Sequence, residues 1–251
     1  MEWHCTIPFS IYVVGVKCMI PKIIHYVWLG EKKQSKLHKK VLKSWAKRAP
    51  EFKIIKWDEE SIQELHNSFL DEALRNKAYA FASDYIRLYA LEKYGGIYMD
   101  LDMILVKNPL EALKNFDLVF SIQDSRVIFQ TSFIAANPHN PFIAECLNFY
   151  KDYKFESESM IPNSELLTPI LLRNYPFMRE DKTQVINNVC AYNSEILLQP
   201  SFNSIAIHIG ETSWKNATKH DKIRIMLRQN LTNQFEAGVF KFFQDIGRKL
   251  I

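Results

Sequence analysis

Short apolar segments alternate with helical segments along this chain, and this alternation limits the possible folds more than any other feature. Strand character, a short run of apolar and β-branched residues, is present in Lys22–Trp28, Phe52–Trp57, Ile97–Asp102, Asp117–Ile122, Val127–Ala136 and Ile205–Ile209. Helical spacing of apolar residues is present in Leu37–Arg48, Ser61–Asn67, Ala78–Tyr94, Phe142–Tyr150 and Glu165–Arg173. This order predicts an α/β fold with a central, mostly parallel sheet flanked by helices.

Length and composition favour one compact domain. The chain has 251 residues and a hydrophobic content of 47%, enough for one substantial core. Its 32 basic and 28 acidic residues give a net charge of only +4, which argues against a dedicated nucleic-acid binder, so we expect no nucleic-acid partner. The four cysteines form no C-x-x-C pair, and neither a zinc module nor a disulfide framework is indicated.

Basic residues gather in two parts of the chain. The first, Lys32–Arg48, has eight lysines or arginines and no acidic residue, which is typical of a solvated helix face or of a patch for an anionic partner. The second, Lys215–Ile251, has eight basic and three acidic residues, and its tail Val239–Ile251 has the spacing of a basic amphipathic helix. The apolar stripe of the tail is explained either by packing onto the domain or by contact with a membrane surface. Its members are Phe240, Phe242, Phe243, Ile246 and Leu250.

We divide the chain into an N-terminal extension of uncertain status (1–18), a main α/β domain (19–220) and a C-terminal basic amphipathic segment (221–251). Either Met1 or Met19 fits as the start. No apolar run reaches the ~18 residues that span a bilayer, and the N-terminus lacks the pattern of a secretory signal. We therefore expect a cytoplasmic protein, with peripheral contact at the inner face of the membrane as an open alternative.

Asp100 and Asp102 end the strand predicted over Ile97–Asp102, at the sheet edge where open α/β folds bind ligands. Side chains two residues apart in a strand project from the same face, so these two carboxylates should lie together. At about 4 Å and an effective dielectric constant near 20 they would repel by roughly 4 kcal/mol. A divalent cation offsets that repulsion, and Mg²⁺ or Mn²⁺ suits the pair because both prefer oxygen ligands and bind substrate phosphates.

The helix before this strand carries Asp84 and Arg87, which are three residues apart and share one face. A surface ion pair would explain them simply. Near the two strand-end carboxylates, however, Arg87 could bind a phosphate or a sugar hydroxyl, and Asp84 could accept hydrogen bonds from hydroxyl groups. The break Gly95-Gly96 lets the backbone turn sharply from the helix into the strand.

In these residues the chain resembles the glycosyltransferases with a DXD sugar-binding motif, family 32, which include capsule and lipopolysaccharide enzymes and share the core of the large glucosylating bacterial toxins. The matching segments, in chain order, are Ile20–Gly30, Ser44-Trp45, Trp57-Asp58, Ser83-Asp84 with Arg87, Gly95–Asp102 and Ala206–Trp214. The resemblance implies a GT-A fold, a nucleoside-diphosphate sugar as donor with uridine diphosphate favoured, Mn²⁺ or Mg²⁺, and retention of the anomeric configuration.

The resemblance also implies roles for single residues. Trp28 would pack on the nucleotide base, Asp84 and Arg87 would hold the donor sugar, and Asp100 would reach both the donor and, with Asp102, the metal. His208 is similar to a late histidine of the family that can complete the metal site, and Glu211 is the competing ligand. Ser213 and Trp214 would close over the diphosphate. The chain departs from the family at Asn163-Ser164 and at Gln130-Thr131, where acceptor contacts would lie.

Taken together, these features predict a metal-dependent, retaining transferase that moves a hexosyl group to a glycan or lipid-linked glycan, in capsule or lipopolysaccharide synthesis. The candidate catalytic side chains are Asp100, Asp102, Arg87 and Asp84. The main alternative is a non-catalytic module that binds a nucleotide sugar or a glycan. A nucleotidyltransferase would need a phosphate-binding loop after the first strand, which Trp28-Leu-Gly30 does not supply. A toxin-like enzyme acting on a host protein is a third alternative.

Overall fold

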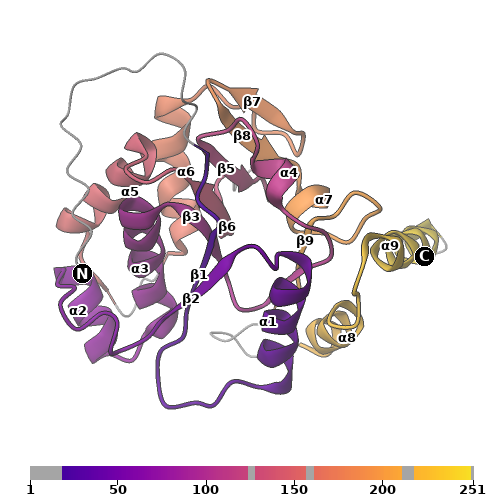
Figure 1. The fold of residues 1–251 in the computed structure, drawn as a ribbon, viewed down its shortest axis with the longest axis horizontal. Coiled ribbons are helices and arrows are strands. Elements are labelled where there is room, and N and C mark those ends of the chain that lie inside the picture. The colour runs from indigo at the N-terminus through magenta and orange to yellow at the C-terminus, as the bar shows by residue number, and fades with distance from the viewer. Residues whose placement is uncertain (1–18, 124–127, 157–160, 211–217, 250–251) are drawn as a thin grey trace.

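The computed structural model describes residues 19–123, 128–156, 161–210 and 218–249 (Figure 1). The strands are β1 Ile23–Val27, β2 Lys53–Trp57, β3 Gly96–Met99, β4 Met103–Leu105, β5 Leu118–Ser121, β6 Gln130–Ala136, β7 Gln184–Ile186, β8 Val189–Tyr192 and β9 Ala206–His208. The helices are α1 Lys36–Arg48, α2 Ser68–Arg75, α3 Tyr79–Tyr94, α4 Leu110–Leu113, α5 Pro141–Asp152, α6 Asn163–Asn174, α7 Ser194–Leu197, α8 Lys219–Arg228 and α9 Gln234–Lys249.

Within the described residues, the centre of the molecule is a seven-stranded sheet in the order β2-β1-β3-β6-β5-β8-β7. The pairs β1–β2, β1–β3 and β5–β8 are parallel, and β6 is antiparallel to both of its neighbours, β3 and β5. It follows that β2, β1, β3, β5 and β8 share one direction, whereas β6 and β7 run the other way. The predicted α/β fold with a mostly parallel sheet is therefore confirmed.

Side chains of the central strands alternate between two cores, one on each face of the sheet. In β6, Ile134 faces the core formed with α2, α3, α5 and α6, whereas Phe133 faces the core formed with α1, α4 and α7. The same alternation in β3 directs Tyr98 toward α3 and Met99 toward α1. Figure 1 shows the two groups of helices on opposite sides of the sheet. Residues that continue the Tyr98 side of β3 therefore face helix α3.

Two predicted elements differ from the structure. Residues 61–67 form turns instead of a helix, because Asn67 caps α2: its Oδ1 accepts from the backbone N–H groups of Phe69 and Leu70. Strand β3 ends at Met99 instead of continuing to Asp102. A turn follows, closed by a 2.9 Å bond from the N–H of Met103 to the carbonyl oxygen of Asp100.

The chain then forms a second sheet, in which β4 pairs antiparallel with β9. The register places Met103 opposite His208, and the N–H of Ile209 donates to the carbonyl oxygen of Asp102 at 2.9 Å. This small sheet brings the predicted late strand, confirmed as β9, beside the turn that carries the two aspartates.

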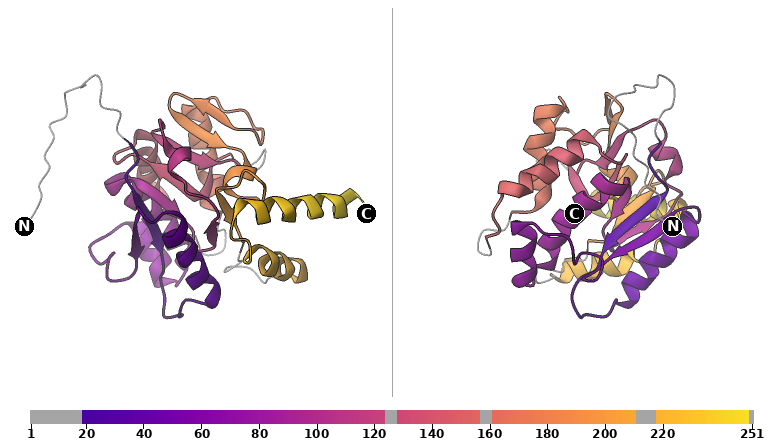
Figure 2. Two further views of the ribbon diagram at one scale, coloured as in Figure 1. Left: turned by 45° about the vertical axis from the view of Figure 1, so that its right-hand side comes forward. Right: turned by 60° about the vertical axis from the view of Figure 1, so that its left-hand side comes forward.

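The C-terminal segment forms α8 and α9, which project from the side of the sheet and helices in the views of Figures 1 and 2. The apolar stripe predicted in the tail does not pack on the domain as a whole. Phe240 is partly buried, but Phe242, Phe243 and Ile246 are exposed, and Leu250 lies outside the described residues. Among the helices of the described part of the chain, none is both long enough and apolar enough to cross a membrane.

Candidate active site

The turn after β3 carries Asp100 and Asp102 at the carboxyl edge of the parallel strands. Strand β1 pairs with β3 so that His25 lies opposite Tyr98, and Trp28 and Asp100 therefore follow their strands at the same edge. Leu101, between the two aspartates, is buried in the core on the α1 side. The two carboxylates lie close together, as predicted, but a turn and not an extended strand brings them there.

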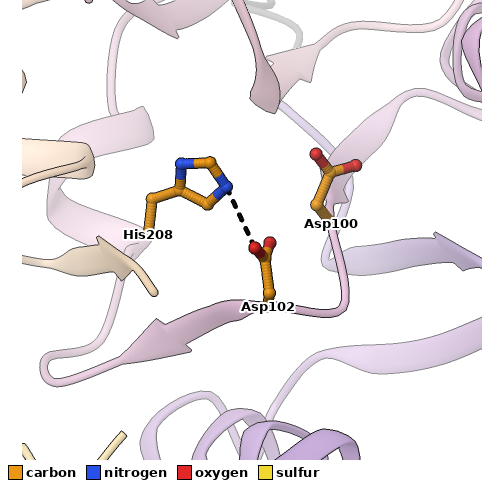
Figure 3. Close-up of side chains that lie close together, drawn as sticks. All are labelled: Asp100, Asp102 and His208. Atoms are coloured by element: carbon orange, nitrogen blue, oxygen red, sulfur yellow. Dashed lines mark ion pairs between the residues drawn. The ribbon is translucent and has the colours of Figure 1, made fainter. Parts of the chain in front are cut away.

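His208, at the end of β9, completes a cluster with the two aspartates (Figure 3). Its Nε2 lies 3.1 Å from Oδ2 of Asp102. One ligand atom from each of Asp100, Asp102 and His208 can be chosen so that all three lie within 4.8 Å of one another. The structure thus brings together the three side chains predicted as metal ligands, from positions more than a hundred residues apart in the chain.

Arg87 is buried beneath this cluster and contacts both Asp84 and Asp100. Its Nη2 lies 2.9 Å from Oδ1 of Asp84, and its Nη1 lies 3.4 Å from Oδ1 of Asp100. The remaining N–H groups donate to the backbone oxygens of Thr131 (2.8 Å) and Ser83 (3.3 Å) and to Oγ of Ser83 (3.1 Å). The guanidinium therefore has protein acceptors on every side, and it fixes the positions of the two carboxylates.

Burial shifts the pKa values of this network. Removal from water raises the pKa of Asp84 to about 7, and the attraction of Arg87 offsets this only in part. Burial also raises the pKa of Asp100, where Asp102 adds to the shift and Arg87 opposes it. For His208, burial lowers the pKa, but Asp102 and Asp100 outweigh it and the net shift is upward. Burial therefore makes the charged forms of Asp84 and Asp100 costly unless positive charge lies beside them.

The donor set fits a divalent cation. Two carboxylate oxygens and an imidazole nitrogen suit Mn²⁺ in particular, and carboxylates with some open positions also suit Mg²⁺. A cation between Asp100 and Asp102 would supply the positive charge that Arg87 alone does not. The imidazole of His208 already points at Asp102, and Arg228 holds the backbone of His208 by donating from Nη1 to its carbonyl oxygen at 2.8 Å.

Tyr98 and Trp45 support the turn and were given no role from the sequence. The hydroxyl of Tyr98 donates to Oδ1 of Asp100 at 2.8 Å, and Arg87 lies over the ring, 4.5 Å from its centroid. Trp45 is fully buried and donates from Nε1 to the carbonyl oxygen of Met103 at 2.7 Å. Tyr98 precedes Asp100 by two residues, and the two-residue period of a strand predicts that such side chains lie on the same face.

His25 contacts the backbone at the Gly95-Gly96 break. Its Nε2 lies 2.9 Å from the carbonyl oxygen of Gly95, and its Nδ1 accepts from Nε1 of Trp57 at 3.1 Å. The carbonyl can only accept, so the proton is on Nε2 and the ring is neutral. Burial lowers the pKa of His25 to about 4, with the bond to Gly95 opposing the shift. Gly95 has φ of +62°, which favours glycine.

The predicted nucleotide contacts are only partly described. Trp28 is half-buried beside His38, with ring centroids 4.6 Å apart, and its Nε1 donates to the carbonyl oxygen of Lys32. It lies at the same edge of the sheet as Asp100. Glu211, Ser213 and Trp214 lie outside the described residues, so the choice between His208 and Glu211 as the third ligand stays a prediction.

The residues at which this chain departs from the family contact the hydrogen-bond network around Arg87. Thr131 donates from Oγ1 to Oδ1 of Asn163 at 2.6 Å, and the carbonyl oxygen of Thr131 accepts from Arg87. Gln130 donates to Gln123 and accepts from the N–H of Ser132. In this chain these side chains bond to one another and to the strand next to Asp100.

Comparison with known proteins agrees with this geometry. Residues 35–120 match the family model described as "Glycosyltransferase sugar-binding region containing DXD motif". An uncharacterized glycosyltransferase of Acanthamoeba polyphaga mimivirus is 32% identical over 135 residues, 49% of this chain and 52% of that protein. Inositol phosphoceramide mannosyltransferase 1 of Schizosaccharomyces pombe is 25% identical over 167 residues, 64% of this chain and 52% of that protein. The chain thus spans about half the length of these relatives.

Among solved structures, the PaToxG glycosyltransferase superposes with a TM-score of 0.51 and 23% identity, covering 63% of this chain and 71% of that one. The glycosyltransferase GlyE of Streptococcus pneumoniae superposes with a TM-score of 0.50 and 8% identity, and the match covers 90% of this chain and 64% of that one. These similarities show the fold and confirm the expected GT-A arrangement. The segment from residue 35 to residue 120, with Asp100-Leu-Asp102 near its end, is therefore similar to the family of glycosyltransferase sugar-binding regions that contain a DXD motif.

Proposed function

We propose that this chain is a metal-dependent glycosyltransferase that moves a hexosyl group from a nucleoside-diphosphate sugar to a hydroxyl group of a glycan. The observation that carries the proposal is the cluster of Asp100, Asp102 and His208 at the carboxyl edge of the parallel strands. Ligands of open α/β sheets bind at this edge, and the match to the DXD family covers both aspartates.

Asp100, Asp102 and His208 would hold Mn²⁺ or Mg²⁺, which when bound neutralises negative charge on the departing diphosphate. Arg87 keeps Asp84 and Asp100 in fixed orientations through the contacts of 2.9 and 3.4 Å. Asp84 would accept hydrogen bonds from hydroxyl groups of the donor sugar, as the family resemblance implies. By the same resemblance, Trp28 would pack on the base, and Ser213 and Trp214 would cover the diphosphate.

For the donor we favour a uridine-diphosphate hexose. The relative from Schizosaccharomyces pombe is named as a mannosyltransferase, and a relative from Pongo pygmaeus, 35% identical over 71 residues and 30% of that protein, is named as lactosylceramide 4-alpha-galactosyltransferase. Both names describe hexosyl transfer to a lipid-linked acceptor. We therefore propose a lipid-linked glycan as the acceptor. Retention of the anomeric configuration and a role in capsule or lipopolysaccharide synthesis stay predictions.

The test is release of nucleoside diphosphate from a panel of nucleotide sugars by the purified protein with Mn²⁺ or Mg²⁺. Slow release from one or two donors is expected, and it should stop with a chelator and with Asp102→Asn. Asp152→Asn, a change of the same chemistry at an exposed position on α5, is the control and should leave release unchanged. The anomeric configuration of any transfer product is then read by NMR.

A binding module is the second function to distinguish. It would bind a nucleotide with Mn²⁺ in calorimetry yet leave every donor intact, whereas the transferase releases nucleotide. Release that continues undiminished in Asp102→Asn and in chelator would remove metal dependence from the proposal.

A further inference from the structure

We infer that the exposed apolar faces of α8 and α9, together with the basic face of α1, form a docking surface for an anionic lipid bilayer. The inference does not depend on the proposed activity. It rests on the orientation of the two C-terminal helices, on the residues that they expose and on the charge beside them.

Helix α9 exposes the apolar side that an ordinary surface helix would bury. Phe235, Val239, Phe242 and Ile246 recur at helical spacing along one side, with Phe243 next to them. The exposed fractions of Phe242 and Phe243 are 58% and 66%. The opposite side packs on the domain through Ala237, which is fully buried, and Phe240, which is partly buried against the core on the α1 side.

Helix α8 has the same reversed orientation. Ile223, Met226 and Leu227 are exposed on one side. The other side carries Arg228, which is buried and donates to the carbonyl oxygen of His208, and Arg224, which donates to that of Gly210 at 3.2 Å. The two helices thus present bulky apolar side chains to solvent, although their inner sides also pack Ile225 and Phe240 against the core.

The two basic clusters of the sequence meet at this place in the fold. Lys40 of α1 donates from Nζ to Oδ1 of Asn230 at 2.9 Å, and Arg48 donates to the carbonyl oxygen of Thr232. Both acceptors lie in the connection between α8 and α9, and Figure 1 shows α1 beside α8. Exposed lysines lie on α1 and on α8: Lys39, Lys43, Lys47, Lys219 and Lys222.

The charge identifies the partner. Exposed phenylalanines on α9, with exposed lysines on the neighbouring α8 and α1, have the composition with which amphipathic elements enter the interface of an anionic membrane. A second copy of the chain is disfavoured on this surface, because it would bring two clusters of the same positive sign together. Docking through α8 would hold the His208 side of the candidate active site near the lipid headgroups.

The test is flotation of the full chain with vesicles of phosphatidylcholine, with and without phosphatidylglycerol. Binding is expected with phosphatidylglycerol, weaker on pure phosphatidylcholine and reduced by salt. The double change Phe242→Ser and Phe243→Ser should lower partition by roughly tenfold or more. Its control is Met178→Ser with Val185→Ser, a pair with similar exposure of 55% and 56% on another face, which should leave partition unchanged.

Charge is tested separately with Lys219→Glu and Lys222→Glu, expected to lower partition on the order of tenfold. The control is Lys151→Glu and Lys154→Glu, exposed lysines with the same spacing in the last turn of α5 and just after it. The salt titration of the unchanged chain needs no variant and so does not depend on their folding. Absence of binding to anionic vesicles overturns the inference, as does binding that both sets of changes leave unaltered. Self-association that is lost in the phenylalanine variant, without vesicle binding, also overturns it and assigns the face to a second copy.

Discussion

Helices α3 and α9 are both sixteen residues long, and each departs from the usual surface helix in the opposite way. Helix α3 buries the charged side chains of Asp84 and Arg87, whereas α9 leaves Phe242 and Phe243 in solvent. Burying a charge and exposing a large apolar side chain both cost free energy unless a partner compensates them.

The two helices differ in where that partner is. For α3 it lies inside the fold, where Arg87 contacts Asp84, Asp100 and the ring of Tyr98. For α9 we place it outside, at a membrane surface. In this molecule, a helix with buried charges or exposed aromatic residues indicates a functional region. The surroundings of those residues indicate whether their partner lies inside the fold or outside it.

The largest expected effect is at Arg87. Arg87→Met removes the buried cation and leaves Asp84 and Asp100 without it, so the free energy of unfolding should fall by about 3–5 kcal/mol. Chemical denaturation measures the change. Arg173→Met is the matched control, since Arg173 pairs with Glu145 at the surface and its side chain is 70% exposed. Equal losses in the two variants would break the comparison.

The next effect concerns His25, which fixes the C-terminal end of α3 through Gly95. Its pKa is about 4 in the folded chain and 6.5 without burial. Between these values the unfolded chain binds the extra proton, so stability contributed by neutral His25 is present above pH 6.5 and is lost as the pH falls toward 4. The loss should total about 3 kcal/mol.

Denaturation curves across this pH range measure that loss, with His25→Gln as the reference because glutamine can donate to Gly95 but does not titrate. The slope of unfolding free energy against pH should be shallower in the variant. A variant with the slope of the unchanged chain would show that His25 is not the group responsible.

A smaller effect is expected from Tyr98→Phe, which keeps the ring under Arg87 and removes the hydroxyl that donates to Asp100. Loss of a hydrogen bond to a metal ligand should weaken Mn²⁺ binding by about 10–100-fold. Isothermal titration measures the affinity. Tyr89→Phe on α3, which removes a hydroxyl bonded to Lys93, is the control. Affinity unchanged by Tyr98→Phe would mean that Asp100 needs no such support.

The smallest effect is expected on α9. Phe242→Ala should change the free energy of unfolding by no more than about 0.5 kcal/mol, because the ring is mostly exposed. Phe133→Ala, in the fully buried core of β6, should cost about 3–5 kcal/mol and provides the contrast. A large loss of stability in Phe242→Ala would show that the ring packs on the domain.

Much of the candidate site follows from local spacing. The spacing of Asp84 and Arg87 places them on one helix face, and the spacing of Asp100 and Asp102 predicts that their carboxylates lie together, although a turn and not a strand brings the second pair together. The packing of α3 on β3, which unites the pairs, follows from alternation, since Tyr98 and Asp100 have the same parity. The family resemblance supplied His208, which no local pattern ties to Asp102.

Other features needed the fold itself. The end of β3 at Met99 depends on a turn whose bond to Met103 leaves no mark in the sequence pattern. The sequence signal for the β7–β8 hairpin is the pair Asn187-Asn188, because asparagine tolerates the positive φ that two-residue hairpin turns require. In the structure these residues have φ of +47° and +63°. For α9, periodicity reveals the apolar stripe but not whether the domain covers it.

The pairing of β4 with β9 has a consequence for how the site comes into being. Asp102 emerges with the first half of the chain during translation, whereas His208 follows more than a hundred residues later. A nascent or truncated chain that stops before Ala206 has both carboxylates and lacks the imidazole. Ion binding by all three proposed ligands therefore requires that synthesis has passed His208 and that β9 has paired with β4.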